Sequence, residues 1–160
     1  MIAHFKREII GWAHDRNIIE GSTPVAQFAK LVEELGEMSI DPEDAIGDAT
    51  VVAYIIAGQL NYPIEELMAM PKKFTKPIDN AVQILGELAG KLARGKDAKE
   101  ELSEVFGLIR AISDKQASAC GVEEAAFDLF YQTCVGVAYN EIKNRKGRMV
   151  DGVFVKEADL

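Results

Sequence analysis

One stretch of the chain, Ala49 to Ala57, is apolar on every side of the helix that it would form. It begins a longer run, Ala49 to Ile64, that contains no charged residue. Asp41 and Pro42 precede it and form a helix start, with Asp41 as the capping residue and Pro42 in the first turn. A helix that is apolar all round is stable only when it is buried. The sequence therefore predicts a buried helix from residue 42 to about residue 60.

Helical periodicity dominates the rest of the chain as well. We expect five further helices, in residues 2–15, 24–39, 78–94, 97–116 and 122–145. The prolines in residues 62–79 indicate a connector with one helical turn at 64–69. Residues 149–155 alternate around Asp151-Gly152, which favours a small β-hairpin. The prediction is a single all-α domain, a helical bundle with a C-terminal β-hairpin.

A faint internal repeat refines this prediction. Residues 30–37 align with residues 80–87, and residues 44–48 align with residues 100–104. The two alignments keep the same order, and the loop in the second copy is longer. The pattern predicts two helical hairpins in tandem.

The charge balance excludes several classes of function. The chain has 18 Lys and Arg residues against 26 Asp and Glu residues, which gives a net charge of −8. Nucleic acids and anionic membranes attract basic surfaces, so we expect neither as a partner. The charged N-terminus is unlike a signal peptide, and the longest uncharged run is short for a membrane span. Two cysteines make neither a disulfide framework nor a CxxC zinc motif, so the expected location is the reducing cytoplasm.

Four carboxylates are the strongest candidates for a functional site. Glu34 and Glu37 share one side of a helix, and Asp44 and Asp48 share one side of the next. An antiparallel hairpin that turns near residue 41 places Glu37 opposite Asp44 and Glu34 opposite Asp48. Converging carboxylates repel one another unless a cation lies between them. Ligands that are all oxygen favour Mg²⁺, with Mn²⁺ as a substitute.

Two other interpretations of these carboxylates were compared with a magnesium site. A solvated acidic helix face explains Glu33, Glu34 and Glu37 on their own, but it does not explain Asp44 and Asp48 on the facing helix. A di-iron site of the ferritin type requires Glu-x-x-His on two helices. The two histidines, His4 and His14, are preceded at that spacing by Met1 and Gly11, so this pattern is absent.

A basic cluster, which contains Lys143, Arg145, Lys146 and Arg148, follows the last predicted helix. Asn140 lies one turn before Lys143 on the same helix face. Favourable charge at a helix C-terminus is the simplest explanation of such a cluster. Beside a metal site, the cluster instead favours a polyphosphate ligand, because Lys and Arg bind the phosphate oxygens that the metal leaves free. Gln27 and Lys30 lie on the same stripe as Glu34 and Glu37.

Several segments resemble the MazG-like branch of the all-α NTP pyrophosphohydrolases, and phage-encoded members most of all. They are Trp12–Asn17, Gln27–Glu37, Asp44–Asp48 and Ala138–Lys156. The resemblance covers roughly residues 5–61 and 120–156. It implies Mg²⁺-dependent hydrolysis of a nucleoside or deoxynucleoside triphosphate to the monophosphate and pyrophosphate. The implied metal ligands are Glu34, Glu37 and Asp48.

We expect other residues to bind the substrate and to assist the reaction. Asn140, Lys143 and Arg145 would hold the β- and γ-phosphates, and Glu33 is a candidate either for the general base or for a ligand in the outer shell of the metal. The base pocket would involve Trp12, His14 and Gln27. The family's second motif, Glu-x-x-Asp, has Ala45 at its first position here, and Asp44 is the expected substitute.

The second copy of the repeat looks degenerate. It keeps Glu87, Glu101 and Glu104, but Ile84 occupies the position of Glu34. Residues 62–120 are therefore expected to be an inserted pseudo-repeat that replaces a partner hairpin. One chain would then mimic a dimer of the family, and we expect a homodimer. The rival hypothesis is a non-catalytic helical assembly module derived from the same family.

Overall fold

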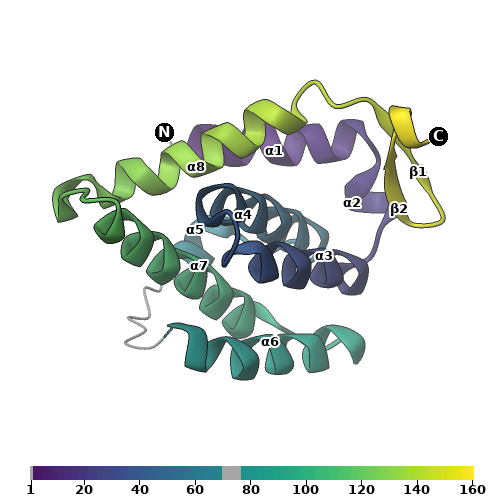
Figure 1. Ribbon diagram of the computed structural model, residues 1–160. Helices are drawn as coiled ribbons and strands as arrows, with labels where there is room; N and C mark the ends of the chain where they lie inside the picture. The colour runs from purple at the N-terminus through teal and green to yellow at the C-terminus, as the bar shows by residue number, and fades with distance from the viewer. Residues whose placement is uncertain (1, 70–76) are drawn as a thin grey trace.

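Helix α4 (Pro42–Gln59) is the centre of the computed structural model, which describes residues 2–69 and 77–160 (Figure 1). Every residue from Ala49 to Ala57 is buried. The helices α1, α2, α3, α7 and α8 all pack against α4. The prediction of a buried helix is therefore confirmed, and the rest of the fold is arranged to cover it.

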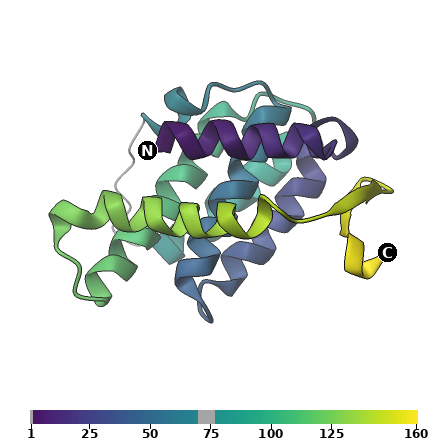
Figure 2. The same ribbon diagram turned by 90° about the horizontal axis from the view of Figure 1, so that it is seen from above.

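The surrounding helices follow in chain order: α1 (Ile2–Asp15), α2 (Ile18–Gly21), α3 (Pro24–Glu37), α5 (Ile64–Met68), α6 (Pro77–Ala93), α7 (Lys99–Ala119) and α8 (Phe127–Ile142). Helices α1 and α8 run side by side in the same direction (Figure 2). Helix α3 packs against α4 and α6 packs against α7, so the two predicted helical hairpins are present. The all-α class is confirmed. No helix in the described residues is long and apolar enough to cross a membrane.

The turn predicted at 64–69 is confirmed as α5, but two other segments differ from the prediction. The short helix α2 was not predicted. Residues 70–76 of the predicted connector lie outside the described residues. The last helix was predicted over 122–145, but a 3-10 turn at Glu124–Ala126 precedes α8, which ends at Ile142.

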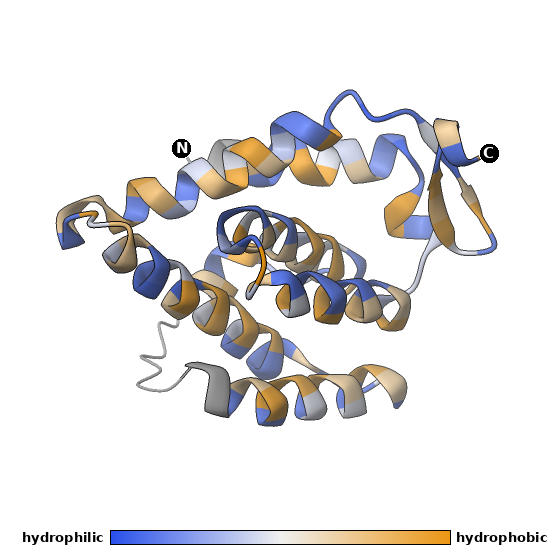
Figure 3. Cartoon of the chain, viewed as in Figure 1, coloured by the Kyte–Doolittle hydropathy of each residue, from blue (hydrophilic) through white to orange (hydrophobic). Residues whose placement is uncertain are grey.

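Arg16 binds the chain just past the end of α8. Its guanidinium donates from Nε to the carbonyl of Arg145 at 2.9 Å and from Nη2 to the carbonyl of Lys143 at 3.1 Å. Carbonyl groups at a helix end need partners from outside the helix. Here the Arg16 side chain, from the segment after α1, is such a partner. The polar loop that leads from α8 to the hairpin begins at this point (Figure 3).

The predicted β-hairpin is confirmed and is slightly longer than expected. Strand β1 (Gly147–Val150) pairs antiparallel with β2 (Val153–Lys156). Asp151 and Gly152 form the turn with positive φ angles of 50° and 82°. Two positive φ angles are the requirement of a type I′ turn, which Asp-Gly meets at low cost. Strand β2 of the hairpin packs against α2.

Close contact between α4 and α8 depends on Gly47. A Cβ atom at this position would lie 2.5 Å from the carbonyl oxygen of Cys134 and 2.9 Å from the Cβ atom of Ala138. One turn further along α4, the buried Thr50 hydroxyl donates to the carbonyl of Ile46 at 2.7 Å and lies 3.2 Å from the Tyr131 hydroxyl. The two helices are thus held at a distance that only a glycine permits.

We predict that Gly47→Ala destabilises the protein by about 1–3 kcal/mol, because the added methyl group forces α8 away from α4. Gly86→Ala is the matched control, since Gly86 is also helical and a Cβ atom there meets nothing within 4 Å. The control is expected to stabilise by about 0.5–1 kcal/mol. Urea denaturation measures both changes. Equal stability of the two variants would contradict this account of the α4–α8 contact.

Candidate functional site

A cleft of about 540 Å³ lies along α3 and α4 and is closed at one end by the hairpin. Eight of the predicted site residues line it: Trp12, Gln27, Lys30, Glu33, Glu34, Glu37, Asp48 and Arg145. They come from four separate parts of the chain. The structure therefore brings these eight residues together in one cleft.

Carboxylates form the acidic part of the cleft. Glu34 is buried, with 9% of its surface exposed, and Asp48 is partly buried on α4. Burial raises the pKa of Glu34, and the Lys30 ammonium opposes this increase. Burial also raises the pKa of Asp48 to about 6, and the negative charges of Glu34, Asp44 and Glu141 add to the effect. Arg145 partly offsets it. The cleft thus holds negative charge under electrostatic strain, which a cation would relieve.

The four predicted carboxylates do not converge as closely as the hairpin geometry predicts. Within residues 2–69 and 77–160, no group of three or more His, Cys, Asp and Glu side chains is arranged to hold a metal ion. Two features explain the difference. Lys30 draws Glu34 into an ion pair of 3.4 Å, and Asp44 lines a second cavity beside α8 instead of the cleft. Glu34, Glu37 and Asp48 remain on the cleft wall.

The cations of the cleft come from opposite walls. Lys30 on α3 pairs with Glu33 at 3.0 Å as well as with Glu34. Arg145 reaches the cleft from the loop that Arg16 fixes. Lys156 on β2 is a third cation that sequence reasoning missed, although it lies within the segment that resembles the family. The cleft can therefore bind an anion between α3 and the C-terminal segment.

Apolar and aromatic side chains form the other part of the cleft. The rings of Trp12 and Phe154 meet edge to face, with centroids 6.1 Å apart. The buried Trp12 Nε1–H has no hydrogen-bond partner in the described structure. Nearby, Gln27 donates from Nε2 to the buried Ser22 hydroxyl at 3.0 Å. Sequence reasoning missed Ser22 and Phe154, because only the fold brings the hairpin and α2 to α1.

Besides Asp44, three predicted site residues lie outside the cleft lining. Exposed His14 pairs with Glu20 at 2.6 Å and does not line the cleft. Lys143 donates to the Oδ1 atom of Asn140 at 2.7 Å, so the two share a helix face as expected, but both are exposed and neither lines the cleft.

The second hairpin has a different polar arrangement. Glu101 on α7 is buried, with 8% of its surface exposed, and its Oε1 atom lies 2.9 Å from the Lys91 ammonium. Glu87 accepts a hydrogen bond from Gln83 at 3.1 Å. The Lys91 ammonium, from the same hairpin, thus provides the positive charge beside Glu101. This arrangement is consistent with a hairpin that serves packing.

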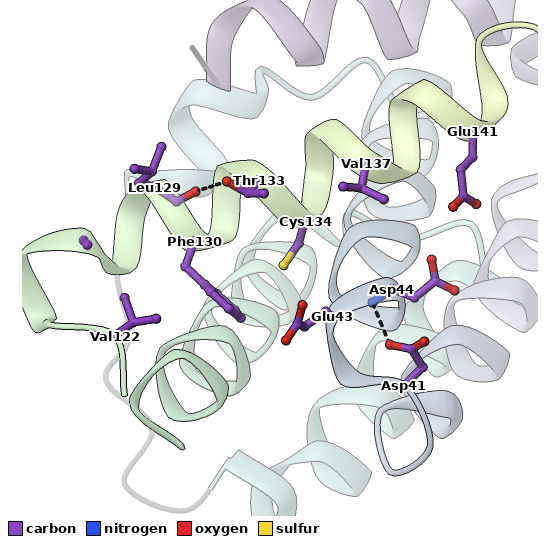
Figure 4. A pocket seen from close by; sticks show the side chains of 11 residues that line it. Asp41, Glu43, Asp44, Val122, Leu129, Phe130, Thr133, Cys134, Val137 and Glu141 are labelled. Atoms are coloured by element: carbon purple, nitrogen blue, oxygen red, sulfur yellow. Dashed lines mark hydrogen bonds between the residues drawn. The ribbon is translucent and has the colours of Figure 1, made fainter. Parts of the chain in front are cut away.

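A second cavity, of about 630 Å³, lies between the N-terminal end of α4 and the outer face of α8 (Figure 4). We call it the α8 groove. Its lining is Asp41, Glu43, Asp44, Val122, Ala126, Leu129, Phe130, Thr133, Cys134, Val137 and Glu141. Glu141 was not predicted as a functional residue. Its signal in the sequence was an acidic residue in the last turn of a helix, where negative charge is unfavourable.

No family model matches the chain, and no solved structure matches it. Part of the chain is similar to an uncharacterized 18.2 kDa protein from the rep-hol intergenic region of Haemophilus phage HP1 (strain HP1c1). The two are 44% identical over 61 residues, which cover 33% of this chain and 37% of that protein. The chain thus matches little more than a third of that relative's length.

We predict that Asp48→Asn raises the melting temperature of the metal-free protein at pH 7. The native state keeps the Asp48 proton up to about pH 6, whereas its ordinary pKa is 3.8. The native state therefore binds the proton more tightly, and the stability contributed by Asp48 falls as the pH rises from about 4 to 7. Thermal denaturation in EDTA should show a higher melting temperature for the variant than for the wild type at pH 7, and a smaller difference at pH 4. An increase in melting temperature that does not depend on pH would show that the raised pKa of Asp48 is not its cause.

Proposed function

We propose that the protein is a Mg²⁺-dependent nucleoside triphosphate pyrophosphohydrolase of the MazG-like type. One observation carries the proposal: a single cleft combines carboxylates, phosphate-binding cations and an aromatic apolar end. A nucleoside triphosphate with its cation needs these three surfaces in this combination. The resemblance of residues 27–37 and 138–156 to the family supports the same assignment.

The donor set of the cleft fits magnesium. Glu34, Glu37 and Asp48 offer only oxygen atoms, which Mg²⁺ prefers. These three residues would hold the cation, whereas Asp44, the fourth predicted ligand, lines the second cavity. Mn²⁺ has similar preferences and is the expected substitute. When bound, the cation neutralises the charge that develops on the phosphate oxygens.

The chain's own residues orient the substrate and accept the proton. Lys30, Arg145 and Lys156 bind the phosphate oxygens as charged donors. In-line attack of water on the α-phosphorus forms a new P–O bond and breaks the bond to the oxygen that bridges to the β-phosphorus. The water's proton passes to Glu33, the candidate base, and the products are the monophosphate and pyrophosphate. Catalysis rests mainly on positioning and on charge complementarity.

The second candidate function is a non-catalytic helical assembly module. One observation favours it: within the described residues, the carboxylates are not gathered into a group that could hold a metal ion. Calorimetric titration with Mg²⁺ and Mn²⁺ separates the two candidates. The absence of binding by either metal, together with the absence of pyrophosphate release, would favour the assembly module.

We predict that the protein releases pyrophosphate from at least one nucleotide in a panel of NTPs and dNTPs with Mg²⁺. Glu37→Gln should reduce this rate by at least about 100-fold, because it removes a carboxylate that stabilises the charge of the reaction. Glu87→Gln, on the outer face of the second hairpin, should leave the rate unchanged. Circular dichroism checks that both variants keep their helical content. Full activity of Glu37→Gln would exclude the proposed role of the cleft.

We predict that Trp12→Phe weakens nucleoside triphosphate binding about 10-fold, because the ring is kept but the unpartnered N–H donor is lost. Binding of Mg²⁺-tripolyphosphate, which has no base, should not change. Tyr139→Phe is the matched control, since its hydroxyl donates to Glu8 at 3.2 Å and does not line the cleft. Isothermal calorimetry measures all the affinities. Weaker binding of both the nucleoside triphosphate and tripolyphosphate would indicate a structural role for Trp12.

A further inference from the structure

The α8 groove is long, and its apolar part is open to solvent. Phe130 and Val137 lie on one face of α8 with Glu141, and this face extends over roughly 16 Å from Phe130 to Glu141. Leu129 exposes 57% of its surface and Val137 exposes 47%. Large apolar side chains along one helix face are the usual surface for another helix. A compact small molecule would cover only a part of this length.

Three of the four acidic side chains of the groove lie toward one end. Figure 4 shows Asp41 and Asp44 at the start of α4 with Glu141 across from them on α8, whereas Glu43 lies nearer the middle of the groove, by Cys134. Leu129 and Phe130 lie toward the other end of the groove. Among the described residues that line it, none is Lys, Arg or His. An occupant that covers the whole groove must therefore bring positive charge to the α4 end.

The helix dipole explains only some of these charges. Asp41, Glu43 and Asp44 begin α4, where negative charge is favourable, and Asp41 caps the helix. Glu141 is different, because it lies in the last turn of α8, where negative charge is unfavourable. In the part of the chain that the structure describes, neither Asp44 nor Glu141 has an ion-pair partner for its carboxylate. The two acidic residues face each other across the groove without compensation (Figure 4).

We propose that the α8 groove is the docking site for an amphipathic helical segment of a partner protein. The apolar face of that segment packs on Leu129, Phe130 and Val137, and its basic end lies between Asp41, Asp44 and Glu141. The complementarity of charge and the length of the groove carry this inference. It does not depend on the nucleotide chemistry of the cleft.

A designed peptide tests the proposal on the full-length chain. The probe is a fluorescein-labelled helical peptide of about 16 residues, with leucines along one face and three lysines in its last turn. A second version of the peptide carries the three lysines in its first turn instead. We expect one version to bind with a micromolar Kd that weakens several-fold as NaCl rises from about 50 to 500 mM. A scrambled peptide with leucines all round the helix should bind at least about 10-fold more weakly.

Surface variants of the protein locate the binding site. The double variant Leu129→Asp, Val137→Asp should bind the probe at least about 30-fold more weakly, because the new charges lie in the apolar contact. Asp44→Asn with Glu141→Gln should weaken it several-fold and remove most of the salt dependence. Val82→Asp is the matched control, because Val82 is 80% exposed on α6, far from the groove lining. Since all the apolar positions are exposed, circular dichroism should show unchanged helical content.

Four results would overturn the proposal. The first is equal affinity for the probe and its scrambled form, and the second is undiminished affinity of the Leu129→Asp, Val137→Asp variant. The third comes from light scattering: a wild-type dimer that this double variant converts to monomers would mean that a second copy of the chain covers the groove. Equal effects of Val82→Asp would also count against the groove as the site.

Discussion

The burial of α4 on every side is the constraint on which the rest of the structure depends. Because this helix has no polar face from Ala49 to Ala57, the chain must cover it with five other helices. Asp48 immediately precedes that stretch, so its carboxylate lies at the edge of an apolar environment. The same burial that stabilises the fold therefore raises the pKa of Asp48 to about 6. Acidic groups with perturbed pKa values in a cleft are typical of functional sites.

A single side chain connects this core to the basic part of the cleft. Arg16, just after α1, donates to the carbonyl groups of Lys143 and Arg145, which lie just past the end of α8. If α8 continued to residue 145, as its sequence alone predicts, Arg145 would remain on the helix and the hairpin would begin elsewhere. The aromatic end of the cleft depends on the same segment, because Phe154 reaches Trp12 only from the hairpin.

Local patterns in the sequence predict most of the fold. Apolar spacing, the Asp41-Pro42 start and the Asp151-Gly152 turn act over a few residues, and the structure contains the elements that each predicts. Contacts between distant segments are less accessible from the sequence. Nothing local to residues 143–145 signals that Arg16 would take over their carbonyl groups, and nothing local to Phe154 signals its contact with Trp12. The magnesium site and the activity stay predictions, because they depend on a ligand and on side-chain movements toward it.

Asp44 shows that the hairpin geometry alone does not determine which cavity a side chain lines. Positions four apart on a helix differ by about 40° in direction, so residues that share a side in the sequence can line different cavities. Asp48 faces the cleft, whereas Asp44 faces Glu141 across the α8 groove. The two cavities nevertheless share one electrostatic field, since Asp44 and Glu141 both contribute to the raised pKa of Asp48. A positive charge between Asp44 and Glu141 would therefore reduce the repulsion at Asp48, although it would lie outside the cleft.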